Sequence, residues 1–245
     1  MLEKEVKYWS ERAVGYSKQE WANDDGYLAK FIEAAKPEKS DIVLDVGCGT
    51  GLVAQRLAPL VNQVVGLDIS EAMMNKGKWE NPVRRVVGDV RAIPFPDETF
   101  DTVTARHVFH HVTEGLPKAI DECYRVLVPG GRIVVSEGVP PSEGVTYEFK
   151  KIFSLKEKRL VFSWFELVRM LLQGGFHSVG RSELRVPSMS VRNWLSNSWL
   201  PQITQDEIFE LHANGSDEFK RAYNLSQLNG DIWIDLKMVI VWGRK

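Results

Sequence analysis

Three glycines and an aspartate stand close together in the stretch DIVLDVGCGTG. Gly47, Gly49 and Gly51 follow an apolar run, and Asp45 precedes the first of them by two positions. Glycine tolerates a positive φ and lets backbone N–H groups approach a ligand closely. A dinucleotide site has the spacing G-x-G-x-x-G, but Leu52 stands where its third glycine would be. Because a carboxylate here repels a pyrophosphate, the loop favours a cationic nucleoside.

Two further acids each end an apolar run. Asp68 closes QVVGLD and Asp89 closes VRRVVGD. Taken singly, each acid is better explained as a helix cap or a loop carboxylate. At the ends of neighbouring strands, however, Asp68 can accept from both hydroxyls of a ribose. Asp89 can accept from an adenine amine while the N–H of Val90 donates to a ring nitrogen. Together with the glycines, these acids predict one nucleoside site.

Three histidines, His107, His110 and His111, follow the next apolar run. Their spacing predicts that they share one side of a helical turn. A metal site needs a further ligand, and HVFHHV supplies none nearby, so we predict no metal. His110 or His111 can serve as a general base. Packing and backbone hydrogen bonding is the third interpretation, and the sequence leaves the choice open.

Strands and helices alternate in the part of the chain that must position these residues. Apolar runs predict strands at 41–46, 63–69, 83–89, 100–107 and 132–139, with helices after Gly51, after an N-cap at Ser70, and over 116–128. Such alternation is typical of an α/β fold whose parallel sheet is covered by helices on both faces. The acids and glycines then meet at the carboxyl edge of the sheet.

The regular alternation of strands and helices ends after residue 139. Residues 140–165 predict a solvated, partly helical insertion with five basic residues: Lys150, Lys151, Lys156, Lys158 and Arg159. A helix stopped by Gly174 and Gly175 follows, and residues 179–187 predict a sixth strand. Residues 188–229 are polar with helical patches, and residues 231–245 predict a long final strand.

Composition excludes several classes of function. The chain has 245 residues, of which 44% are hydrophobic and 26% charged, and its net charge is −2. This balance lacks the basic surface that nucleic acid requires. No apolar run is long enough to span a membrane and the first residues are charged, so we expect a cytoplasmic protein. Cys48 and Cys123 are too few for a disulfide framework and are expected as reduced thiols.

The stretches LDVGCGTG, VVGLDIS, GDVRAIPFPDETFD, HHV and RVLVPGGRIVVSE together resemble the class I S-adenosylmethionine-dependent methyltransferases, in particular the ubiquinone and menaquinone branch. The resemblance is dense over residues 41–138. It implies a Rossmann-like doubly wound sheet of seven strands in the order 3-2-1-4-5-7-6, with the last strand antiparallel and helical cap segments. It also implies one domain, made of an N-terminal cap (1–39), a cofactor-binding core (40–139), substrate-side insertions (140–165 and 188–229) and a final strand (230–245).

The same resemblance assigns roles to the candidate residues. Asp45, Gly47 and Gly49 would surround the methionine part of S-adenosylmethionine, Asp68 would bind the ribose, and Ile69, Met73, Asp89 and Val90 would contact the adenine. Tyr16 would reach the methionine carboxylate. Arg106 is a further candidate for that carboxylate, with a surface arginine as the alternative.

We therefore expect methyl transfer from S-adenosylmethionine, which becomes S-adenosylhomocysteine, to a small-molecule acceptor. Aromatic residues in the cap and the insertions favour an apolar or aromatic acceptor and O- or C-methylation, although such residues are more often core than pocket. The helix carrying Trp194 and Trp199 is either a lid or a contact in a homodimer. Two alternatives stay open: a non-catalytic module that binds the cofactor, and an NAD-dependent oxidoreductase.

Overall fold

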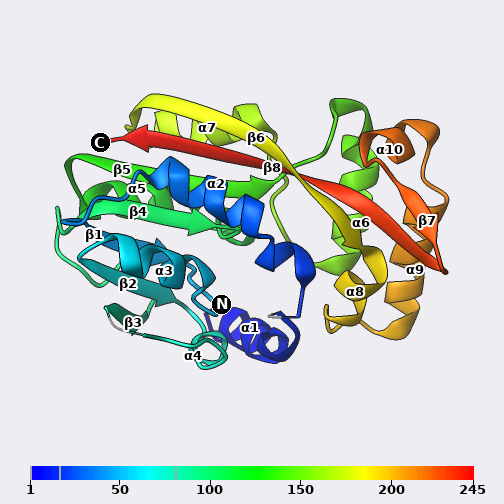
Figure 1. Ribbon diagram of the computed structural model, residues 1–245, viewed down its shortest axis with the longest axis horizontal. Coiled ribbons are helices and arrows are strands. Elements are labelled where there is room, and N and C mark those ends of the chain that lie inside the picture. Colours follow the sequence, from blue (N-terminus) through cyan, green and yellow to red (C-terminus); the bar gives the residue numbers. More distant parts are fainter. Residues whose placement is uncertain (1, 17, 81) are drawn as a thin grey trace.

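The computed structural model describes residues 2–16, 18–80 and 82–245. A twisted sheet runs through the molecule, with helices on both of its faces (Figure 1). The strands are β1 (Ile42–Val46), β2 (Gln63–Asp68), β3 (Val83–Val87), β4 (Phe100–Arg106), β5 (Leu127–Gly138), β6 (His177–Ser190), β7 (Ser226–Leu228) and β8 (Asp231–Arg244). The helices are α1 (Leu2–Tyr16), α2 (Asp25–Ala35), α3 (Leu52–Leu57), α4 (Glu71–Met74), α5 (Leu116–Val126), α6 (Thr146–Lys156), α7 (Trp164–Gln173), α8 (Val191–Ser196), α9 (Gln202–Ala213) and α10 (Asp217–Ala222).

The strand order is β3-β2-β1-β4-β5-β8-β6, and β8 runs antiparallel to both of its neighbours. β1 to β5 are parallel. This confirms the predicted α/β class and sheet order, with β8 as the predicted last strand. The short strand β7, which pairs with the start of β8, was not predicted. No helix in the described ranges is both long and apolar enough to cross a membrane.

Alternation along the strands explains why helices cover both faces. Val43 packs with α2 and α3, whereas its neighbour Leu44 packs with α5 and α7. Val134 and Val135 divide between the faces in the same way. Successive side chains of a strand point to opposite faces, so a continuous apolar run must be covered on both.

A second group of helices forms a lobe at one end of the sheet. The lobe consists of α6, α8, α9 and α10 with β7 and the adjoining ends of β6 and β8, and it has its own apolar core. β8 joins both parts, because Ile232 and Ile234 lie in the lobe core while Val239 and Val241 lie in the sheet core. In Figure 1 the arrowhead of β4 points toward this lobe. The carboxyl ends of the parallel strands therefore face it.

The predicted solvated insertion is wrong in one respect. Lys150, Lys151 and Lys158 are exposed, but the side chains of Lys156 and Arg159 are only 10% and 7% exposed. The end of α6 packs into the lobe, which turns these two side chains inward. Basic residues alternate between solvent and interior here, and composition does not distinguish the two environments.

Candidate active site

A pocket lies between the carboxyl edge of the sheet and the lobe. Its sheet side is lined by the glycine turn, the ends of β1, β2 and β4, and the segment after β3. Its lobe side is lined by α6, the segment that follows it, α8 and β8. Helix α1 borders both sides, because it packs against α4 and also donates from Arg12 Nη1 to the Ser198 carbonyl at 2.8 Å.

The glycine turn has the backbone conformation that its composition requires. Gly47, Gly49 and Gly51 have φ values of +60°, +54° and +82°, which side chains of L-residues rarely tolerate. A Cβ on Gly47 would also lie 2.4 Å from Val108 Cγ2. The turn therefore needs glycine for conformation and, at Gly47, for space.

Asp45 provides an incompletely satisfied carboxylate beside this turn. Its Oδ1 accepts from Thr104 Oγ1 at 2.8 Å, whereas its Oδ2 is buried and has no hydrogen-bond partner among the described residues. Burial raises the pKa of Asp45 to about 7. A buried carboxylate oxygen without a donor is costly. The pocket thus offers a place for a ligand that supplies a donor or a positive charge, which fits the amino group and sulfonium of S-adenosylmethionine.

Asp68 holds the turn in place as well as lining the pocket. Its carboxylate accepts from the backbone N–H groups of Gly49 and Ser70, each at 2.8 Å. Burial raises the pKa of this carboxyl, and these backbone hydrogen bonds lower it again in part. Ser70 caps α4 by accepting from the Met73 N–H at 3.3 Å, as predicted. Ile69 and Met73 line the pocket beside Asp68.

Asp89 already accepts hydrogen bonds from a neighbouring side chain, which the sequence did not predict. Arg91 donates to both of its carboxylate oxygens at 2.7–3.0 Å and also to Glu5 of α1 at 2.6 Å. Burial raises the pKa of Asp89, but the hydrogen bonds from Arg91 outweigh it and lower that pKa overall. Asp89 and Val90 line the pocket, and the carboxylate retains lone pairs for a further donor.

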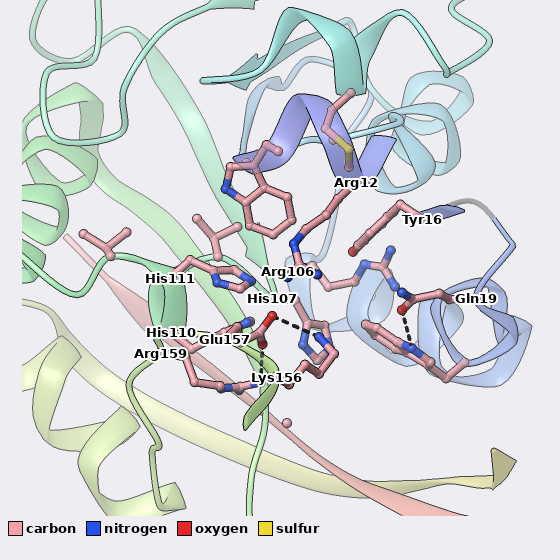
Figure 2. Close-up of a pocket in the computed structure, with 18 of the residues that line it drawn as sticks. Arg12, Tyr16, Gln19, Arg106, His107, His110, His111, Lys156, Glu157 and Arg159 are labelled. Atoms are coloured by element: carbon pink, nitrogen blue, oxygen red, sulfur yellow. Dashed lines mark hydrogen bonds and ion pairs between the residues drawn. The ribbon is translucent and has the colours of Figure 1, made fainter. Parts of the chain in front are cut away.

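Tyr16 and Arg106 enter the pocket from different elements. Arg106, at the end of β4, is only 9% exposed and donates from Nη1 to the Ala22 carbonyl at 2.9 Å. The surface-arginine alternative is therefore wrong. Tyr16 ends α1, and burial raises the pKa of its phenol while nearby Arg106 lowers it. Figure 2 shows the two side chains next to each other in the cavity.

The three histidines line the pocket, though not on one regular helical turn. His107 has a φ of +58°, and only Phe109–His111 forms a turn, of the 3-10 type. The rings of His110 and His111 nevertheless lie 3.8 Å apart, and those of His107 and His110 lie 5.9 Å apart. Burial lowers the pKa of all three imidazoles well below the ordinary value. They are therefore neutral near pH 7.

Two carboxylates approach the histidines from distant parts of the chain. Glu137, at the end of β5, lies 2.5 Å from His110 Nδ1 and also accepts from the His110 N–H at 3.2 Å. Glu157 shares a cluster with His110 and His111 in which the candidate ligand atoms lie within 4.8 Å of one another. The stretch HVFHHV itself contains no further ligand, but the fold brings Glu137 and Glu157 close to the histidines. Two cations beside Glu157 nonetheless oppose binding of a metal ion there.

These two cations are Lys156 and Arg159. Lys156 Nζ lies 2.9 Å and Arg159 Nη1 3.3 Å from the Glu157 carboxylate, which also accepts from Tyr8 Oη at 3.1 Å. Figure 2 shows Glu157 and Arg159 on the same side of the cavity as His110 and His111, with Tyr16 and Gln19 opposite. Trp194 lines this side and is buried, while Trp199 is 57% exposed.

Sequence reasoning missed Arg12, Glu137, Lys156, Glu157 and Arg159. Only Glu137 carried a usable signal, because it ends a predicted parallel strand just as Asp45 and Asp68 do. The remaining four reach the pocket through packing of α1 and the lobe. Cys48 and Cys123 are free and buried, which agrees with the predicted thiols.

Comparisons with known proteins agree with this geometry. A family model described as a methyltransferase domain matches residues 44–135. A demethylmenaquinone methyltransferase of Thermotoga maritima is 33% identical over 189 residues, which are 75% of this chain and 75% of that protein. The chain belongs to the class I S-adenosylmethionine-dependent methyltransferases. The predicted family is therefore confirmed, and the oxidoreductase alternative falls.

Other methyltransferases match different shares of the chain. A demethylmenaquinone methyltransferase of Symbiobacterium thermophilum is 36% identical over 123 residues, 46% of this chain and 48% of that protein. The chain thus spans about half the length of that relative. The crystal structure of the YcgJ protein from Bacillus subtilis superposes with a TM-score of 0.80 at 25% identity, covering 91% of this chain and 99% of that one. The lobe is therefore included in the shared fold.

Proposed function

We propose that this methyltransferase transfers the methyl group of S-adenosylmethionine to a small-molecule acceptor with an apolar or aromatic body, at oxygen or carbon. The observation that carries the proposal is the buried, unpartnered Oδ2 of Asp45 beside the glycine turn. It lines the same pocket as the apolar residues of the lobe. One pocket therefore offers a site for a cationic ligand and, next to it, a site for an apolar molecule.

The cofactor would lie along the sheet side. The residues proposed to bind it are Asp45, Gly47 and Gly49 for the methionine part, Asp68 for the ribose, Ile69, Met73, Asp89 and Val90 for the adenine, and Tyr16 and Arg106 for the carboxylate. All ten line the pocket. Their positions on the ends of β1, β2 and β4, after β3 and at the end of α1 let them surround one extended ligand.

S-adenosylmethionine supplies a methyl carbon already activated by a sulfonium. The protein must then chiefly align the acceptor and exclude water. The buried lobe side is suited to both, since Phe149, Phe153 and Trp194 line it. No dedicated catalytic residue is required when the acceptor arrives as a good nucleophile.

A base is required only when the acceptor arrives protonated, and we assign that role to His110 or His111. His110 is held by Glu137 through both its ring and its backbone. With Nδ1 bonded to the carboxylate, Nε2 is left to accept a proton. Its lowered pKa keeps the imidazole neutral, which a base must be.

The names of the relatives suggest one kind of acceptor. Two of them are called demethylmenaquinone methyltransferases, and a quinone-like ring would suit the aromatic lining of the lobe side. The acceptor of this chain is nevertheless open within the apolar and aromatic class.

Thermal unfolding tests cofactor binding. We expect saturating S-adenosylhomocysteine to raise the melting temperature, since a ligand at about a hundred times its Kd adds roughly 2.7 kcal/mol. NAD should leave the melting temperature unchanged. A shift with NAD alone would contradict the proposal. Formation of S-adenosylhomocysteine with candidate acceptors then separates an enzyme from a non-catalytic module.

A further inference from the structure

Charge is distributed unevenly in the pocket. Among the described residues of its sheet side, the acids outnumber the cations Arg91 and Arg106, and the cationic cofactor is proposed to bind there; these acids are Glu5, Asp45, Asp68 and Asp89. The lobe side carries the cations Arg12, Lys156 and Arg159. Among the described residues lining that side, Glu157 is the carboxylate that faces them. The two sides therefore suit ligands of opposite charge.

Glu157 cannot neutralise the whole cluster. It contacts both Lys156 and Arg159. Burial raises the pKa of its carboxyl, but the coulombic effects of Lys156, Arg159 and the two neighbouring histidines together outweigh burial and hold that pKa well below the ordinary range. One negative charge thus faces at least two positive charges in side chains that are at most 10% exposed. Excess charge in a buried place is unfavourable unless a ligand or solvent compensates it.

The other groups near the cluster do not remove the excess. Arg12 adds a cation that lies over the Tyr8 ring at 4.0 Å, and Lys237 pairs with Glu183 at 3.0 Å. Glu137 is fully buried behind the pocket and bonded to His110, and burial raises the pKa of its carboxyl, which favours the uncharged form. The histidines are neutral because burial lowers their pKa.

Apolar rings surround the same cations. Arg159 lies over the Phe153 ring at 4.3 Å, and Lys156 lies over the Trp194 ring at 5.3 Å. Ile152 and Phe149 of α6 line the pocket beside them. A molecule that fills this side would contact rings and aliphatic groups with most of its surface and cations at one point.

We propose that the methyl acceptor is an amphiphilic organic acid whose anionic group binds at Lys156 and Arg159 and whose apolar body packs against Phe149, Phe153 and Trp194. This inference rests on the proposed function and names the class of its acceptor. The anionic group is the recognition element and not the atom that is methylated. The methionine carboxylate does not account for the cluster, because Arg106 and Tyr16 are assigned to it.

Matched pairs of acids and amides test the proposal by calorimetry. Benzoate, 1-naphthoate and 2-naphthoate are each compared with their carboxamides on protein saturated with S-adenosylhomocysteine. We expect at least one acid to bind about tenfold more tightly than its amide, because charge-assisted hydrogen bonds exceed neutral ones. Added salt should weaken binding of the acid and leave binding of the amide unchanged. If no acid binds more tightly than its amide, the proposal is wrong.

Three substitutions locate the preference. Lys156→Gln and Arg159→Gln should each reduce the preference for the acid severalfold and leave binding of the amide unchanged. Lys158→Gln is the matched control, since that side chain is 76% exposed and pairs with Glu114. If the control loses the preference and the other two keep it, the anion binds elsewhere and the assignment falls.

Binding of S-adenosylhomocysteine to each variant keeps this test apart from that of the proposed function. Retained affinity shows that Lys156→Gln or Arg159→Gln has folded. If the wild-type chain fails to bind S-adenosylhomocysteine, the proposed function fails, while the acid preference is still measured on the protein alone. If the cofactor product binds and the acids show no preference, only the acceptor class is wrong.

Discussion

The sheet side and the lobe side of the pocket are built in different ways. On the sheet side, each key residue ends a strand or forms the turn after it, so Asp45, Gly47 and Asp68 are positioned by the backbone of the sheet. On the lobe side, Arg12 comes from α1 and Lys156 and Arg159 come from the end of α6 and the segment after it, so tertiary packing places them together. Cofactor binding depends on local motifs, and acceptor recognition depends on how the lobe packs.

The largest effect should come from removing the counter-charge on the lobe side. Glu157→Gln leaves Lys156 and Arg159 buried without their carboxylate, and we expect a loss of about 3–5 kcal/mol in the free energy of unfolding. Urea denaturation measures it. Glu114→Gln removes an exposed partner of Lys158 and should cost under about 1 kcal/mol. Equal small losses in both variants would show that the charge of Glu157 does not stabilise Lys156 and Arg159 in the folded protein.

On the sheet side, Asp68→Ala should mainly affect cofactor affinity. Each lost hydrogen bond to the charged carboxylate contributes about 1.5–3 kcal/mol, so the Kd for S-adenosylhomocysteine should rise roughly tenfold to a hundredfold or more. Titration calorimetry measures the change. Asp97→Ala, a surface acid paired with Arg125, is the control. An unchanged Kd for Asp68→Ala would remove the ribose assignment.

Two glycine substitutions separate backbone strain from close packing in the turn. Gly47→Ala places a methyl group 2.4 Å from Val108 at a φ of +60°, whereas Gly130→Ala meets nothing within 4 Å at a φ of +77°. Both should lose about 1–2 kcal/mol of stability from conformation. Gly47→Ala should lose about 1–3 kcal/mol more from overpacking. Equal melting temperatures for the two variants would contradict the packing role.

The last prediction concerns pH. Because burial raises the pKa of Asp45 to about 7, its carboxyl is charged above that pH and neutral below it. Binding of the amino group of S-adenosylhomocysteine should therefore weaken as pH falls, by up to about tenfold per unit below pH 7. Calorimetry between about pH 5 and pH 8 checks this. Asp45→Asn should remove the dependence, and an Asn variant with the same profile would assign it to another group.

Much of the sheet could be predicted because the features that specify its strands lie in short stretches of sequence. Buried parallel strands require apolar runs, and the turn after β1 requires glycine, so β1 to β5 and the acids at their ends follow from short stretches. The predicted bounds of β5, 132–139, were less accurate. The strand begins at Leu127, before the turn at Gly130, because Leu127 already pairs with Phe100. Pairing partners lie far apart in sequence and cannot be seen from one stretch.

The lobe side could not be predicted, because nothing local distinguishes Lys156 from Lys158. One side chain is 10% and the other 76% exposed, and the difference arises from the packing of α6 against α8 and α9. For the same reason, the sequence did not predict that Glu137 and Glu157 lie beside the histidines. These acids approach from β5 and from the segment after α6, whereas the acid nearest to His110 along the sequence, Glu114, is exposed and pairs with Lys158.

A crystal structure with S-adenosylhomocysteine tests the central claim most directly. We expect ribose hydroxyls on the Asp68 carboxylate, the amino group near Asp45, and the ligand carboxylate toward Tyr16 and Arg106, with the sulfur facing the lobe side. An adenosyl group bound elsewhere, with the carboxyl edge of the sheet left free, would contradict it.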